Sequence, residues 1–148
     1  MFSIILPTYN EKDNIVPLIN AIIQIFSRFH NISYEIIIVD DNSPDGTSEE
    51  ILKYFHNKKV KLITRKNDKG LATAIKDGIL NSNGDYILIM DTDFSHPPDF
   101  IINLISAIKQ DDIDCVIASR YVPGGIMNSN KIKFLLSKLM NLLIGKVL

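Results

Sequence analysis

The alternation of short apolar runs with longer amphipathic segments constrains the fold most. Runs of strand length occur at residues 3–7, 34–39, 60–64, 86–90 and 114–119. The first and fourth are almost wholly apolar, which is typical of strands buried on both faces of a parallel sheet. The intervals between runs are long enough to hold a helix, as parallel neighbours require. The chain therefore predicts an α/β fold: a Rossmann-like, mostly parallel sheet with right-handed crossovers and helices on both faces.

Local signals predict where the helices begin and which faces they bury. The first helix is expected from about residue 14, with Pro17 in its first turn. Thr47 opens the sequence TSEE, which has the spacing of a capping box, so we interpret Thr47 as a structural N-cap. A helix over residues 71–81 has a small face suited to close packing, formed by Ala72, Ala74 and Gly78. The helix over residues 98–110, capped by Ser95 or His96, is expected to turn five apolar side chains inward: Phe100, Ile101, Leu104, Ile105 and Ile108.

Composition excludes several classes of function. Sixteen basic and 17 acidic residues give a net charge of −1, which offers no electrostatic footprint for nucleic acid. The single cysteine, Cys115, lies in an apolar run and is predicted to be a buried small hydrophobe. One cysteine allows no disulfide within the chain, which fits a reducing, cytoplasmic compartment. Neither a signal peptide nor a transmembrane helix is expected from the apolar runs of this sequence.

Polar side chains follow the predicted strands directly. In a parallel sheet the carboxyl ends of the strands lie along one edge, so one crevice collects these side chains. Asp91 and Asp93 supply two hard oxygen ligands, an arrangement that holds Mg²⁺ or Mn²⁺ while substrate phosphates supply further oxygens. From the residues alone, the alternative is that both carboxylates only cap the loop and the next helix. The side chains at the strand ends are Tyr9 and Glu11 after the first, Asp40 and Asp41 after the second, Asp91 and Asp93 after the fourth, and Arg120 after the fifth.

Motifs of other enzyme classes are absent from the sequence. No glycine-rich phosphate loop follows the first strand, which argues against P-loop and dinucleotide chemistry. The sequence has no Gly-x-Ser-x-Gly elbow and no plausible Cys/His pair, which argues against covalent hydrolysis. His96 precedes two prolines, so a capping or packing role is favoured over metal ligation.

Five motifs in order identify a family resemblance. They are PTYNE at residues 7–11, VDDNSPDGT at 39–47, KGLATA at 69–74, MDTDFSHPP at 90–98, and SRY at 119–121 followed by Gly124 and Gly125. Together they resemble the GT-A family-2 glycosyltransferases, most closely the polyprenol-phosphate mannose synthases. The resemblance runs through nearly the whole chain and implies a GT-A fold. It also implies an inverting, metal-dependent transfer of mannose from GDP-mannose to dolichyl or polyprenyl phosphate.

The resemblance also implies roles for individual residues. The acceptor phosphate would meet Arg120 and Lys133, and Lys133 stands about where the family has an arginine, so it keeps the charge without the bidentate fork. Asp91 and Asp93 would hold Mg²⁺ or Mn²⁺ on the diphosphate, with Asp93 also counted among the catalytic residues. The nucleotide sugar would be bound by Pro7, Tyr9, Glu11, Asp40, Asp41, Lys69 and Asp91.

The last part of the sequence differs from the rest. We assign residues 1–128 to the nucleotide-sugar-binding core and residues 129–148 to the start of an amphipathic helix. Apolar and basic residues interleave there, as in helices that lie on a membrane surface. The alternative is a core helix without its packing partner. We expect the family domain to continue beyond Leu148, and we expect the protein to associate with the cytoplasmic face of a membrane.

Three other functions stay open from sequence. The first is a family-2 transferase that uses a UDP-sugar, such as UDP-glucose, and a lipid or cell-wall acceptor. The second is a sugar nucleotidyltransferase, which would need a glycine-rich, basic loop where this chain has TYNE at residues 8–11. The third is an inactive nucleotide-binding fragment.

Overall fold

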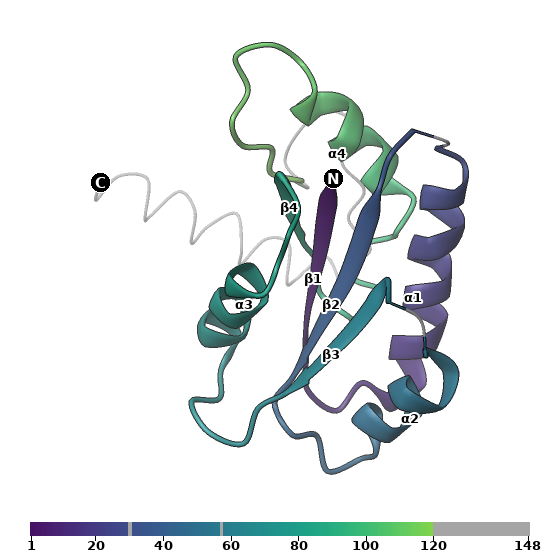
Figure 1. Ribbon diagram of the computed structural model, residues 1–148, viewed down its shortest axis with the longest axis vertical. Helices are drawn as coiled ribbons and strands as arrows, with labels where there is room; N and C mark the ends of the chain where they lie inside the picture. Colours follow the sequence, from purple (N-terminus) through teal and green to yellow (C-terminus); the bar gives the residue numbers. More distant parts are fainter. Residues whose placement is uncertain (30, 57, 120–148) are drawn as a thin grey trace, which may run out of the picture.

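The computed structural model describes residues 1–29, 31–56 and 58–119. Within these ranges the order of elements is β1 (Phe2–Thr8), α1 (Lys12–Ser27), β2 (Tyr34–Asp40), α2 (Thr47–Tyr54), β3 (Val60–Thr64), α3 (Leu71–Leu80), β4 (Tyr86–Ile89) and α4 (Phe100–Ile108). The strands form one sheet in the order β3-β2-β1-β4, and every neighbouring pair is parallel (Figure 1). The predicted parallel α/β fold is confirmed.

Helices cover both faces of the sheet, as predicted. The chain steps outward from β1 to β2 to β3, with α1 and α2 on one face, and then returns to the far side of β1 as β4 (Figure 1). Because the direction of travel reverses, a crossover of the same hand places α3 on the opposite face. The strand order therefore switches between β1 and β4, and ligands of open α/β sheets bind outside the carboxyl ends at such a point.

The core lies mainly between the sheet and α1. Ile4 and Leu6 of β1 and Ile36 and Ile38 of β2 are fully buried in one cluster, which also receives side chains of α1, α2 and α4. On the opposite face, α3 approaches so closely that a Cβ at Gly78 would lie 2.4 Å from Cγ2 of Ile5. A side chain at that position would force the helix away from the sheet.

Some helix predictions are corrected by the structure. Helix α1 begins at Lys12, so Pro17 lies inside the helix. The N-cap of α2 is Gly46, and Thr47 is the first helical residue, with its hydroxyl bonded elsewhere. The N-cap of α4 is Asp99, not Ser95 or His96, and it makes no side-chain capping bond.

The buried faces of α3 and α4 follow the prediction except at one residue each. Ala74 and Gly78 of α3 are buried, whereas Ala72 lies on the opposite side of the helix and is exposed. In α4, Ile101 and Ile105 are buried, and Leu104 and Ile108 are partly buried and pack against the same core, as predicted. Phe100 is 43% exposed, so it alone of the five does not face inward.

The predicted fifth strand does not form. Residues 115–119 carry no strand assignment, and among the described residues β4 pairs only with β1. Cys115 is consequently exposed instead of buried. The edge of β4 is open among the described residues, and residues 115–118 line the pocket beside it without pairing with it, so apolar composition alone did not make this segment a strand. The boundary predicted after residue 128 lies outside the described residues.

Candidate functional site

The loops after β1 and β2 are joined by side-chain hydrogen bonds. Three consecutive backbone N–H groups, of Asn10, Glu11 and Lys12, donate to side-chain oxygens of the second loop: Ser43 Oγ at 2.9 Å, Thr47 Oγ1 at 3.1 Å and Asp45 Oδ2 at 3.1 Å. The Thr47 hydroxyl in turn donates to Asp45 Oδ1 at 2.6 Å. The polar residues of the second motif thus fix the position of the first loop.

Asp40, at the end of β2, is the anchor of this arrangement. Its carboxylate is fully buried and accepts hydrogen bonds from the backbone N–H and the hydroxyl of Ser43 and, at 2.6 Å, from Ser48 Oγ. A buried carboxylate needs such donors to offset the loss of water. The acceptor sites of Asp40 are therefore occupied by the protein itself.

Asp41 accepts its hydrogen bonds from the loop between β3 and α3. One of its oxygens, Oδ1, accepts two hydrogen bonds from the Arg65 guanidinium, and Oδ2 accepts one from Gly70 N–H at 2.7 Å. Asp41 keeps 8% of its surface exposed, and Arg65 keeps 6%. Sequence reasoning missed Arg65, although one signal was available: it directly follows β3, beside the strand that ends in Asp40 and Asp41.

Two of the predicted nucleotide-binding side chains that reach solvent lie in the loops after β1 and before α3. Tyr9, directly after β1, is 55% exposed, and Lys69, just before α3, is exposed as well. Glu11 is partly buried and accepts a 2.7 Å hydrogen bond from Asn14 Nδ2. Pro7 is buried within β1, where its neighbour on β2 is Val39. Arg120 and Lys133 lie outside the described residues.

Asp91 and Asp93 follow β4, which pairs with β1, the strand that precedes Tyr9, at the switch point. Thr92 between them is buried, whereas both carboxylates face solvent. Asp91 Oδ2 lies 3.6 Å from Nδ1 of His96, so His96 contacts the predicted site instead of capping α4. The backbone N–H of Ser95 donates to Asp93 at 2.8 Å and, with help from the Ser95 hydroxyl, lowers the pKa of Asp93 below its usual value. Asp93 is therefore a carboxylate near neutral pH.

This donor set fits a divalent cation that is shared with a ligand. Within the described residues, no group of three or more His, Cys, Asp or Glu side chains is placed to hold a metal ion by itself. Two exposed carboxylates supply only part of the coordination shell of Mg²⁺ or Mn²⁺, and substrate phosphates and water usually complete it. The predicted metal-binding role of Asp91 and Asp93 stays a prediction.

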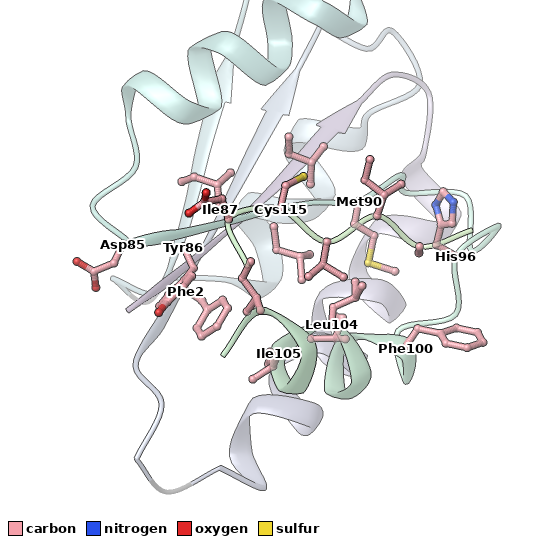
Figure 2. A pocket seen from close by; sticks show the side chains of 18 of the residues that line it. Phe2, Asp85, Tyr86, Ile87, Met90, His96, Phe100, Leu104, Ile105 and Cys115 are labelled. Carbon is pink, nitrogen blue, oxygen red and sulfur yellow. The ribbon is translucent and has the colours of Figure 1, made fainter. Parts of the chain in front are cut away.

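An apolar pocket of about 690 Å³ lies beside this site, between β4 and α4 (Figure 2). In Figure 2, His96 is at one end of the pocket, Asp85 is at the other, and Cys115 lies along its wall. The pocket follows the edge of β4 that no described residue pairs with. It therefore marks the place where the sheet is open.

Comparison with known proteins identifies the family. The model of the family described as "Glycosyl transferase family 2" matches residues 3–142, which is nearly the whole chain. This chain belongs to glycosyltransferase family 2.

The curated relatives that this chain matches carry a more specific name than the family does. The chain is 43% identical over 127 residues to the dolichol-phosphate mannosyltransferase of Pyrococcus furiosus, covering 83% of this chain and 34% of that protein. It is 36% identical over 124 residues to the dolichol-phosphate mannosyltransferase of Saccharomyces cerevisiae, covering 83% of this chain and 46% of that protein. The chain thus spans less than half the length of the curated relatives it matches.

Solved structures agree on the fold. A mannosyltransferase from Pyrobaculum calidifontis, solved with GDP-Man and Mn²⁺, matches with a TM-score of 0.63 at 22% identity, over 81% of this chain and 36% of that one. TarS from S. aureus, in complex with UDP-GlcNAc, matches with a TM-score of 0.53 at 27% identity, over 62% of this chain and 26% of that one. The GT-A fold predicted from the motifs is confirmed.

The described residues contain no candidate membrane span. Among the described residues, no helix combines the length and the apolar character that crossing a bilayer requires.

Proposed function

We propose that the chain is the nucleotide-sugar-binding part of an inverting mannosyltransferase that moves mannose from GDP-mannose to dolichyl or polyprenyl phosphate. The observation that carries this proposal is its 32–43% identity to three curated proteins, all named dolichol-phosphate mannosyltransferase. The exposed Asp91 and Asp93, which follow β4 at the switch point with β1, the strand that precedes Tyr9, support a site for a metal-bound diphosphate.

Burial refines the roles proposed for the residues at the end of β2. Asp40 has no exposed surface and its acceptor sites are filled, so it supports the loop from beneath. Asp41 is the acid of this pair that keeps some exposure, and its Oδ2 accepts one hydrogen bond, from Gly70 N–H, so it has an acceptor site left for a base or ribose. Tyr9, Glu11 and Lys69 complete the proposed nucleotide site.

The reaction needs little proton chemistry from the protein. The acceptor phosphate monoester has a second pKa of about 6, so near neutral pH it is already largely a dianion. One of its oxygens attacks the anomeric carbon, the bond from that carbon to GDP breaks, and GDP leaves from the opposite side with inversion. Asp91 and Asp93 would hold a Mg²⁺ or Mn²⁺ ion, which when bound neutralises the charge that develops on the departing diphosphate.

The acceptor side of the proposal rests on sequence. Arg120 and Lys133 are assigned to the acceptor phosphate, which they would align for in-line attack. Residues 129–148 are proposed to meet the membrane surface from the cytoplasmic side, since their basic and apolar residues interleave.

Calorimetric titration of the 148-residue chain tests the donor half of the proposal. GDP, UDP, GDP-mannose and UDP-glucose are compared with and without Mn²⁺, on the chain and on the double variant Asp91→Ala/Asp93→Ala. The matched control is Asp111→Ala/Asp114→Ala, two exposed acids beside the amino end of β4. We expect Mn²⁺-dependent binding of the guanine nucleotides, weakened at least about tenfold only in the site variant, a loss of about 1.4 kcal/mol.

Two results would change the proposal. A preference for uridine nucleotides would replace it with a UDP-sugar transferase, in line with the TarS complex noted above. No nucleotide binding by the folded chain would overturn the donor site itself.

A further inference from the structure

We infer that Arg65 is a positioning residue of the nucleotide-sugar site: its guanidinium holds Asp41 and the loop that carries Lys69 in one arrangement. The inference deepens the proposed function and rests on it. Arg65 is nearly completely buried at the junction of β2, β3 and α3, and arginine is seldom buried without partners.

Every N–H donor of this guanidinium has an acceptor in the protein. The five hydrogen bonds run from Nε and Nη2 to Asp41 Oδ1, from Nη1 to Asp77 Oδ2 and to the carbonyl of Asp68, and from Nη2 to the carbonyl of Gly70. A guanidinium has five N–H donors in a rigid fork, so none is left over for a ligand. Arg65 therefore acts on the site through its neighbours.

These bonds fix a loop that the backbone alone would not hold. The loop from β3 to α3 contains Asp68 with φ 53° and Gly70 with φ 135°, both in the left-handed half of conformational space (Figure 1). Arg65 binds the carbonyls of both residues at 3.1 and 3.0 Å, and Asp41 binds the N–H of Gly70 at 2.7 Å. Lys69, the exposed residue between them, is thereby held at a set distance from Asp41.

The double contact also orients Asp41. Both hydrogen bonds from Arg65 fall on Oδ1, which leaves Oδ2 with the single donor Gly70 N–H. The carboxylate plane is set by three donors from two residues of the β3–α3 loop, so its remaining acceptor site points in one direction. An arginine-to-lysine change keeps the positive charge but loses the fork, and one ammonium group does not reproduce five contacts in this geometry.

Nucleotide titration of Arg65→Lys, Lys69→Ala and the double variant tests this coupling, with Lys76→Ala as the control for loss of an exposed positive charge on α3. Each single site variant is expected to weaken binding of GDP with Mn²⁺ about fivefold or more. In the Arg65→Lys background, Lys69→Ala is expected to add less than about twofold, because Lys69 has already lost its position. Lys76→Ala should bind as the unchanged chain does.

A measurement without nucleotide separates positioning from unfolding. Amide hydrogen exchange of Gly70 should speed up in Arg65→Lys while exchange in β1 and β2 stays slow. Asp77→Asn, which alters one peripheral contact of 3.2 Å to a partly exposed residue, should shift both binding and Gly70 exchange in the same direction by a smaller factor.

The outcomes are distinguishable. Failure of the unchanged chain to bind any nucleotide overturns the proposed function and this inference with it. Normal binding by Arg65→Lys, or fully additive effects of Arg65→Lys and Lys69→Ala in a chain that does bind GDP, overturns the inference alone.

Discussion

Two pairs of acids follow two strands of the same sheet, and their surroundings differ: β2 is largely buried, whereas three of the four residues of β4 are exposed. Asp40 and Asp41 end β2 and lie buried, with hydroxyl, amide and guanidinium donors around them. Asp91 and Asp93 follow β4 and face solvent. The same local pattern thus builds a scaffold at one place and leaves free ligand groups at another.

The difference comes from what surrounds each strand. β2 is flanked by β1 and β3, so the loops of three strands crowd its carboxyl end and supply donors. β4 has one strand neighbour among the described residues, and the polar contacts of Asp91 and Asp93 come from His96 and Ser95 of their own loop. Carboxylates surrounded by protein donors add to stability, whereas exposed ones are available to a metal ion or phosphate.

The largest predicted effect is on the buried ion pair. Asp41→Ala leaves the Arg65 guanidinium buried with two of its hydrogen bonds lost, and breaking a buried pair in this way costs about 3–5 kcal/mol. Urea unfolding near neutral pH measures the change in the free energy of unfolding. A loss below about 1 kcal/mol, typical of exposed pairs, would contradict the scaffold role.

A smaller loss is predicted at Asp40. Asp40→Asn keeps the shape of the side chain but turns one acceptor into a donor that faces Ser43 or Ser48, both of which donate to Asp40 now. Leaving such a buried group unsatisfied costs about 1–3 kcal/mol. The same unfolding experiment on Ser48→Ala, which removes one donor, should give a smaller loss; an equal or larger loss would show that Asp40 is not the centre of this cluster.

The exposed pair should behave oppositely. Asp91→Asn/Asp93→Asn is predicted to change the free energy of unfolding by less than about 0.5 kcal/mol, as is usual for exposed positions. Nucleotide binding in the presence of Mn²⁺ should nevertheless fall, because neutral amides are weaker ligands for hard cations. A large loss of stability with unchanged binding would reverse the assignments of the two pairs.

Periodicity and strand-end chemistry were enough to predict the parallel sheet and its helices from sequence. The apolar run at 86–90 and the two acids after it were identified in this way. What sequence could not give is which acids are buried, since Asp40 and Asp91 both directly follow apolar runs. Burial depends on the position of a strand in the sheet, and Arg65 was missed because its partners, Asp41 and Asp77, are distant in sequence.

The failed prediction of a fifth strand has the same origin. Residues 114–119 have a strand-like composition, but composition does not say whether a segment pairs with an open edge such as that of β4. Cys115 was predicted to be buried on the same assumption and is exposed. Local propensity was reliable where long-range packing agreed with it, as in β1 and α1, and was overridden where it did not.

The smallest predicted effect concerns acid stability at Asp93. The hydrogen bond from Ser95 N–H lowers the pKa of Asp93 in the folded chain below the usual 3.8, so its contribution to stability is present above that value and is lost as pH falls through the folded pKa. In metal-free protein, Asp93→Asn should lower the free energy of unfolding by less than about 0.5 kcal/mol near neutral pH, and by nothing at the acid limit. Urea unfolding at a series of pH values measures the difference between the chain and the variant. A difference that grows as pH falls has the wrong sign for a lowered pKa, and would show that the hydrogen bonds from Ser95 do not stabilise the Asp93 carboxylate.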